Sequence, residues 1–355
     1  MRAIAIAAIL MAAVAVQAGP YSPASGSSTA IDAGIPGFVG PAGDGVVDDE
    51  NAVNPLFKAW ASGYSNYAPS GYVEEPYRDP TRALGPVTGL EVEDVVSLGD
   101  LSLAQIQAGT PAGRITLSFA QTIGDGPGAD LAIFENGQYR FGAFFAELAY
   151  VEVSSDGTHF ARFASRSLTP ARVGDYGLID PSNVYNLAGK HANAYGTSWG
   201  TPLDLSGLAS DPLVSGGLVD TMLIRYVRLV DVPGSGDFLD STGSPIYDPW
   251  ETWGSGGLDL EAAGAINLSP SPGDANNDGA VNVGDLGILA GNWGAQGTLR
   301  WAQGDFNKDG VINVGDLGVL AGRWGWQRAA GAAVPEPTGL AVMLMGGLFV
   351  RRKST

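Results

Sequence analysis

The sequence contains no cysteine, only two histidines and only four lysines. Without cysteine, disulfide bonds, thiolate metal sites and cysteine nucleophiles are all excluded. The formal net charge is −18 over 355 residues. Nucleic-acid binding needs a positive surface, so this charge balance argues against that class of function. A strongly acidic chain suits instead a protein that meets divalent cations.

The sequence also lacks the local motifs of common catalytic sites. There is no Gly-x-Ser-x-Gly turn, no His-Glu-x-x-His helix and no phosphate-cradling loop. A Ser-His-Asp triad would have to use His159 or His191, and we assign no catalytic residue. Carboxylates could supply a glycosidase pair, although the sequence favours a surface charge or a cation ligand for each of them. The candidates are Glu135, Glu147, Asp231, Asp248, Glu251, Asp259 and Glu261.

Charged residues make up only 16% of the chain, and glycine occurs 52 times. Such a composition favours a loop-rich, mainly β protein, and the length allows two or three domains. Apolar residues alternate over 114–119 and 149–154, and short apolar runs follow at 131–134, 222–232 and 256–266. Short strands between Gly/Pro turns predict an antiparallel jelly roll or β-sandwich over residues 50–267.

One pattern occurs twice between residues 273 and 326, with a period of 31 residues. With the first Asp of each copy as position 1, oxygen-bearing side chains fall at positions 1, 3, 5, 9 and 12, and Gly at 6. This is the spacing of a calcium loop of the EF-hand type, in which position 7 supplies a backbone carbonyl. The predicted ligands are Asp274, Asn276, Asp278, Ala280, Asn282 and Asp285 in one copy, and Asp305, Asn307, Asp309, Val311, Asn313 and Asp316 in the other.

Calcium is a hard cation that takes six to eight oxygen ligands, so it suits this set of carboxylates and amides. Without a cation, each close carboxylate pair repels by ~4 kcal/mol at an effective dielectric constant of ~20. We therefore predict that folding of the repeated region is coupled to Ca²⁺. A polar Asx-turn is the alternative for one copy, and the second copy argues against it.

Each loop is followed by a short helical pattern at spacing i, i+3, i+4 and i+7. We expect these faces to pack on each other, with the tryptophans supplying contacts that offset the helix-weakening glycines. The two faces are Leu286, Leu289, Ala290 and Trp293, and Leu317, Leu320, Ala321 and Trp324.

Residues 273–326 resemble a type I dockerin, which consists of two calcium loop-helix repeats. In that family, positions 10 and 11 of each loop help to recognise a cohesin partner and are often Ser-Thr. The corresponding residues here are Val283-Gly284 and Val314-Gly315. The resemblance implies calcium binding and a protein partner, whereas recognition of a cohesin does not carry over with these residues.

Residues 50–267 resemble the N-terminal domain of exported bacterial cell-surface proteins with a discoidin-like, galactose-binding-like fold. Such jelly rolls often hold a structural Ca²⁺, for which Asp130, Glu135 and Asp259 are the expected ligands. Loop aromatics could stack on sugar rings or fill the loop core. The segments that carry the resemblance are 54–63, 83–86, 126–136, 145–157 and 226–231.

Both ends of the chain resemble export signals. Residues 1–18 have a basic start, an apolar stretch and small residues before a cleavage site, which predicts a signal peptide followed by a flexible segment at 19–49. Linkers are expected at 268–272 and 327–333. Residues 334–355 resemble a PEP-CTERM sorting signal: Pro335-Glu336-Pro337, an apolar helix and a basic end. That resemblance implies transient membrane anchoring and processing by an exosortase-type protease.

These features together predict an exported, calcium-stabilised protein of the cell surface or matrix. The β-sandwich would bind a glycan or matrix component, and the dockerin-like module would mediate assembly. The alternative is a secreted glycoside hydrolase or other polysaccharide-active enzyme tethered by that module.

Overall fold

A computed structural model describes residues 56–87, 94–140, 143–191, 193 and 199–327. The predicted signal peptide (1–18), the segment at 19–49 and the sorting signal with Pro335, Glu336 and Pro337 lie outside these ranges. Almost all of the linker predicted at 327–333 also lies outside them. Within the described ranges, no helix combines the length and the apolar character needed to cross a lipid bilayer.

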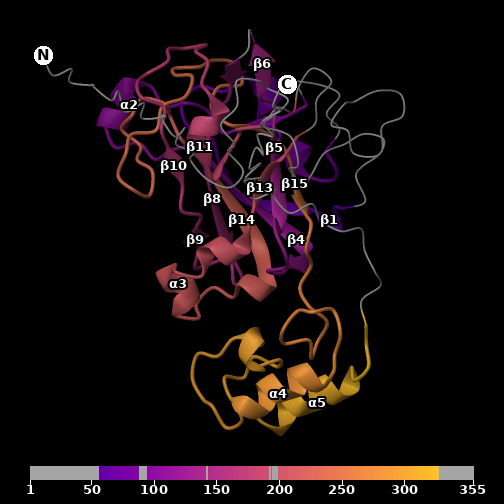
Figure 1. Ribbon diagram of the computed structural model, residues 1–355. Coiled ribbons are helices and arrows are strands. Elements are labelled where there is room, and N and C mark those ends of the chain that lie inside the picture. The colour runs from indigo at the N-terminus through magenta and orange to yellow at the C-terminus, as the bar shows by residue number, and fades with distance from the viewer. Residues whose placement is uncertain (1–55, 88–93, 141–142, 192, 194–198, 328–355) are drawn as a thin grey trace, which may run out of the picture.

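Two antiparallel sheets form the larger part of the molecule (Figure 1). In the first sheet the order is β1 (Ala59–Trp60), β15 (Asp259–Ala265), β5 (Leu131–Glu135) and β13 (Thr201–Leu203), and β3 (Val96–Ser97) also pairs with β15. In the second the order is β12 (Leu187–Ala188), β8 (Ala149–Ser154), β14 (Ile224–Asp231), β4 (Arg114–Ile123) and β2 (Gly63–Ala68), and β9 (Ala161–Arg162) also pairs with β8.

The main hydrophobic core lies between these sheets. Ile133 and Leu260 from the first sheet share one buried cluster with Val151 and Val227 from the second. Face-to-face packing of two antiparallel sheets buries the apolar side of each, which is the sandwich arrangement. The mainly β, antiparallel class predicted from the sequence is thus confirmed, and each predicted apolar run contains a strand.

Short elements and long loops connect the strands. The other paired strands are β6 (Gln138–Arg140) with β7 (Ala143–Phe145), and β10 (Arg166–Ser167) with β11 (Val184–Tyr185). The short helices are α2 (Leu103–Gln107) and α3 (Pro212–Ser215), with 3₁₀ turns η2 (Glu75–Tyr77), η3 (Pro80–Ala83), η4 (Pro181–Asn183), η5 (Leu205–Leu208), η6 (Thr221–Leu223) and η7 (Trp301–Gln303). An Asp side chain accepts a backbone N–H at the start of η3, η4, η5, η6 and α3, which fixes these turns locally.

The repeated region forms a separate helical module at one end of the molecule, where α4 (Val283–Gly291) and α5 (Val314–Gly322) lie together (Figure 1). The chain after α4 bonds to the second loop, since the Gly294 N–H donates to the Ile312 carbonyl. The chain after α5 bonds to the first loop in the same way, from Gly325 to Val281. Each repeat therefore closes the other.

The module packs on the sandwich through the turn before β14. Met222 and Leu223 belong to the hydrophobic cluster of the module, together with Trp301 and Phe306. The Asn277 amide donates to the backbone carbonyl of Asp125 at 2.6 Å. The segment predicted as a linker at 268–272 begins with residues bonded to the end of β4, because the Ser269 N–H donates to the Thr122 carbonyl.

The two repeat tryptophans differ from the sequence-based expectation. Trp293 and Trp324 lie beyond the ends of α4 and α5 and are 51% and 53% exposed. Leu289 and Leu320 are buried as expected. The prediction that Trp293 and Trp324 pack between the helices is therefore wrong, because each helix ends at a Gly before its face reaches the Trp.

Candidate metal centres and an aromatic pocket

The two repeated loops share most of their internal hydrogen bonds. The position-1 carboxylate accepts from the position-6 Gly N–H, at 3.1 Å for Asp274 and 3.2 Å for Asp305. The position-12 carboxylate accepts from the N–H groups of positions 2, 3 and 9 in both copies. These bonds draw the two ends of each loop around a common centre.

The backbone conformation of both loops also favours a tight turn around this centre. Position 4 adopts a left-handed conformation in both loops, with φ of 52° at Asn277 and 59° at Lys308. Position 6 does so as well, with φ of 84° at Gly279 and 75° at Gly310, where a side chain would be strained. Local residue types therefore impose a turn that directs alternate side chains inward.

Three carboxylates converge in the second loop. Oxygens of Asp305, Asp309 and Asp316 lie within 4.8 Å of one another, so this group could hold a metal ion. Asp305 Oδ1 is buried and has no hydrogen-bond partner in the structure. Burial raises the pKa of Asp305, and the neighbouring carboxylates of Asp316 and Asp309 raise it further.

The remaining predicted ligands take part in the loop as well. Asn282 and Asn313 at position 9 cap the N-termini of α4 and α5, where their side chains accept the N–H of Gly284 and Gly315. The position-7 carbonyl of Val311 accepts from the Asn313 amide at 3.0 Å. A carbonyl oxygen has two lone pairs, so this bond leaves one for a cation.

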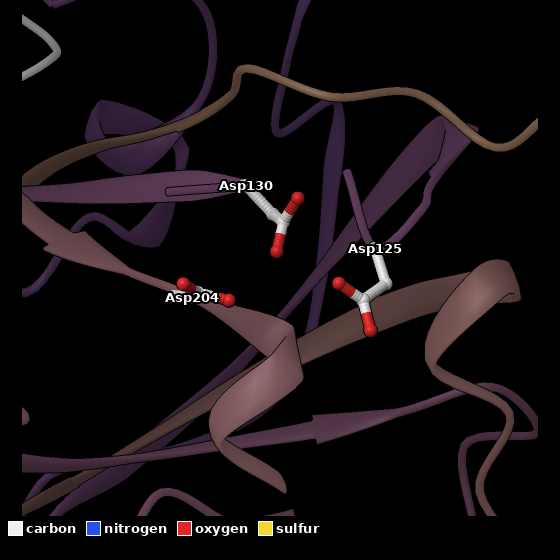
Figure 2. A group of neighbouring side chains, drawn as sticks. All are labelled: Asp125, Asp130 and Asp204. Carbon is white, nitrogen blue, oxygen red and sulfur yellow. The ribbon is translucent and has the colours of Figure 1, made fainter. Parts of the chain in front are cut away.

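A second acidic group lies in the sandwich, where Asp125, Asp130 and Asp204 direct their carboxylates toward a shared space (Figure 2). This group could also hold a metal ion. Asp130 already accepts N–H groups from Gly126 and Leu205. Burial raises the pKa of Asp125 to about 6, and the Asp204 carboxylate adds to this shift.

The three residues proposed from the discoidin resemblance do not meet at one point. Asp130 precedes β5 and Glu135 ends it, so the strand separates them by roughly 16 Å at its usual rise per residue. Glu135 and Asp259 lie at the other end, where β5 pairs with β15. Asp259 and Glu147 line one pocket of about 240 Å³.

Aromatic side chains form the rim of that pocket. Phe145 and Tyr176 stack with ring centroids 6.2 Å apart, and Trp253 meets Tyr176 edge-on at 6.3 Å. Tyr176 and Trp253 are 57% and 56% exposed. The sequence pattern shows Trp253 only as one of several loop aromatics. Its partner Tyr176 is distant in the chain, and no sequence signal joins them.

The two histidines lie in different surroundings. His159 Nδ1 lies 2.8 Å from Asp156 Oδ2 in an exposed turn, whereas His191 is buried. No protein-family model matches the chain, and no curated protein matches it.

Proposed function

We propose that this chain is an exported surface or matrix protein whose helical module is stabilised by calcium. The duplicated loop carries this proposal: two twelve-residue segments with the EF-hand pattern of oxygens share the same hydrogen bonds and left-handed positions. Hard carboxylate and carbonyl oxygens at that spacing favour Ca²⁺.

Terbium luminescence tests the metal site, because Tb³⁺ replaces Ca²⁺ and is excited through a nearby indole. The Trp301 indole donates to the Asp274 carbonyl at 3.0 Å, so it reports on the first loop. Calcium should displace terbium from the full chain. Asp274→Ala should lower the Trp-sensitised signal, because only the second loop then holds terbium beside Trp301, whereas Asp175→Ala, at an exposed Asp outside both loops, should leave it unchanged. Absence of the signal in the wild-type chain would refute calcium binding here.

A protein partner of the module is proposed from two matching surface residues. Val283 and Val314 begin α4 and α5 and are 73% and 72% exposed. An exposed valine at the same place in both repeats adds little to the stability of the isolated module. Contact with a partner would bury it, so we favour a role in partner binding. Val283→Ser with Val314→Ser should keep calcium binding and abolish calcium-dependent retention on envelopes of the source cells. Retention by the double variant would contradict this role.

Glycan binding by the sandwich is proposed from the aromatic rim of the 240 Å³ pocket. Exposed aromatic faces beside polar groups favour sugar rings over apolar ligands. Calorimetry with oligosaccharides should show binding that Trp253→Ala weakens at least tenfold, while Tyr72→Ala, at an exposed tyrosine outside the pocket lining, has no effect. Release of reducing sugar, lost in Glu147→Gln, would instead support the polysaccharide-active enzyme.

Export and sorting are proposed from the sequence resemblances alone. Intact-mass measurement of the protein recovered from source cells should show cleavage after Ala18 and near Pro335-Glu336-Pro337. Glu336→Ala should block the second cleavage and keep the chain in the membrane fraction. Secretion of a chain with an uncut C-terminus would contradict the sorting role.

A further inference from the structure

Six buried carboxylates gather where strands of both sheets end. Glu135 is the last residue of β5, Asp231 is the last of β14, and Asp259 is the first of β15. Antiparallel pairing sets β15 beside β5, and the sandwich core sets these strands against β14. We call the group the acidic core; it consists of Asp100, Glu135, Glu147, Asp231, Asp248 and Asp259, all at most 5% exposed.

In five of these carboxylates, the two oxygens differ in the same way. One oxygen accepts a hydrogen bond, and the other is buried with no hydrogen-bond partner. The bonded oxygens take N–H groups of Thr252, Gly137, Leu258 and Leu148 and the side-chain amide of Asn136. The oxygens without a partner are Asp100 Oδ1, Glu135 Oε1, Asp231 Oδ2, Asp248 Oδ1 and Asp259 Oδ1. A buried polar atom without a partner is destabilising by about 1–3 kcal/mol, and more when charged, so five require an explanation.

A single hydroxyl links two members of the acidic core. Thr252 Oγ1 lies 2.6 Å from Glu147 Oε1 and 3.3 Å from Asp100 Oδ2, and it accepts the Gly257 N–H. A hydroxyl has one proton, so it can donate to only one of these two carboxylates at a time. The other contact brings two oxygen atoms together without a hydrogen bond between them.

The charge of the acidic core is not balanced by ion pairs. Among the described residues, none of its six carboxylates forms a salt bridge. Burial raises the pKa of Glu147, and the carboxylates of Asp259, Glu135 and Asp100 add to that shift. Burial also raises the pKa of Asp231, with Asp100 and Asp259 as neighbours.

The backbone brings four of these carboxylates together. The Gly257 N–H donates to Glu147 Oε1, and the N–H of the next residue, Leu258, donates to Asp231 Oδ1. Thr252 lies between Glu147 and Asp100, and Asp259 shares one pocket lining with Glu147.

We propose that Asp100, Glu147, Asp231 and Asp259 bind a divalent cation, with Ca²⁺ favoured because every ligand is a hard oxygen. A bound cation gives the partnerless oxygens of Asp100, Asp231 and Asp259 a positive partner. It also replaces the repulsion between the carboxylates with attraction to the shared ion. Glu147 and Asp259 line the aromatic pocket, which gives the ion an entry path.

This site is independent of the repeated loops. It draws its ligands from the sandwich, and Asp125, Asp130 and Asp204 do not contribute to it. Asp130 differs chemically as well, because both of its oxygens accept hydrogen bonds. Loss of the loop sites and loss of this site can therefore be measured separately.

Native mass spectrometry of the full chain in calcium counts the ions. The wild-type chain should carry three, and Asp274→Ala with Asp305→Ala should carry one. Asp231→Asn should lose one ion and keep two, because the amide replaces a ligand charge in the acidic core only. Two loop ions in the variant also show that it is folded. An unchanged ion count in Asp231→Asn would overturn the site, even with both loops occupied.

Thermal unfolding supplies the second measurement. In chelator, Asp231→Asn should unfold at the same temperature as the wild type or higher, because it removes a buried like charge. In calcium, it should unfold at a lower temperature. Asp240→Asn is the control, because that carboxylate is also buried but accepts backbone N–H groups at both oxygens. It should be less stable in both conditions. If Asp231→Asn were less stable than the wild type in both conditions, the Asp231 carboxylate would have a purely structural role and would not bind a cation.

Discussion

The repeated loops and the acidic core differ in where their carboxylates come from along the chain. Asp305, Asp309 and Asp316 lie within one loop, and hydrogen bonds inside that loop orient them. Asp100 and Asp259 are far apart in sequence: Asp259 begins β15, and Asp100 lies in the chain just after β3, with which β15 pairs. A local centre depends on residue spacing alone, whereas the acidic core depends on the whole sandwich. Damage to one should therefore leave the other intact.

The largest effect should follow from disabling both loops. Each ion contributes about 4 kcal/mol at a concentration 1,000 times its dissociation constant, which for two sites reaches the whole stability of a small module. In Asp274→Ala with Asp305→Ala, amide hydrogens of α4 and α5 should exchange fast in calcium, while those of β8 and β14 stay protected. Hydrogen-exchange mass spectrometry measures both regions at once. Equal protection of α4 in the variant and the wild type would show that the module folds without bound calcium.

The sequence predicts the loops well because their information is local. Residue types at fixed spacing specify the turn and the start of each helix, as Asn282 and Asp285 do together at α4. It also predicts the principal strands, since the alternation at 114–119 reports one buried face of β4. The acidic core could not be predicted in this way, because no spacing relates Asp100 to Asp231.

Burial of individual aromatics also depends on packing that spacing does not specify. Trp293 and Trp301 are close in sequence, yet Trp293 is 51% exposed and Trp301 only 6%. The helical period suggested the first as core. The second sits in a 3₁₀ turn, η7, and packs edge-on against Phe306 at 5.1 Å. The module is thus closed by a residue outside the repeated helix pattern.

An intermediate effect should come from changing these two tryptophans. Trp301→Ala removes a buried ring and its bond to the Asp274 carbonyl, so the module should lose about 3–5 kcal/mol. Trp293→Ala should change its stability by less than about 0.5 kcal/mol. Urea unfolding in calcium, followed by helix circular dichroism, compares them. A loss in Trp293→Ala as large as in Trp301→Ala would restore the interhelical packing role expected from the sequence.

The smallest effect should come from Asp125, at the contact between the two regions. Its folded-state pKa of about 6 exceeds the ordinary 3.8, so the folded chain binds this proton more tightly than the unfolded chain does. The ionised carboxylate therefore lowers stability as pH rises from about 4 to about 6, and fully above that range. Asp125→Asn should add roughly 1 kcal/mol at pH 8, a value reduced for partial solvent screening, and nothing at pH 4.

Urea unfolding at both pH values in constant calcium measures this difference. The Asn277 bond to the backbone carbonyl of Asp125 is unaffected by the substitution, so the module contact serves as an internal control. A loss of stability at pH 8 that is much larger than one hydrogen bond from Thr221 would mean that Asp125, Asp130 and Asp204 share a cation, because a bound positive charge makes the ionised carboxylate favourable there. The sign and size of this effect thus decide whether that group behaves like the loops or like ordinary turn-capping aspartates.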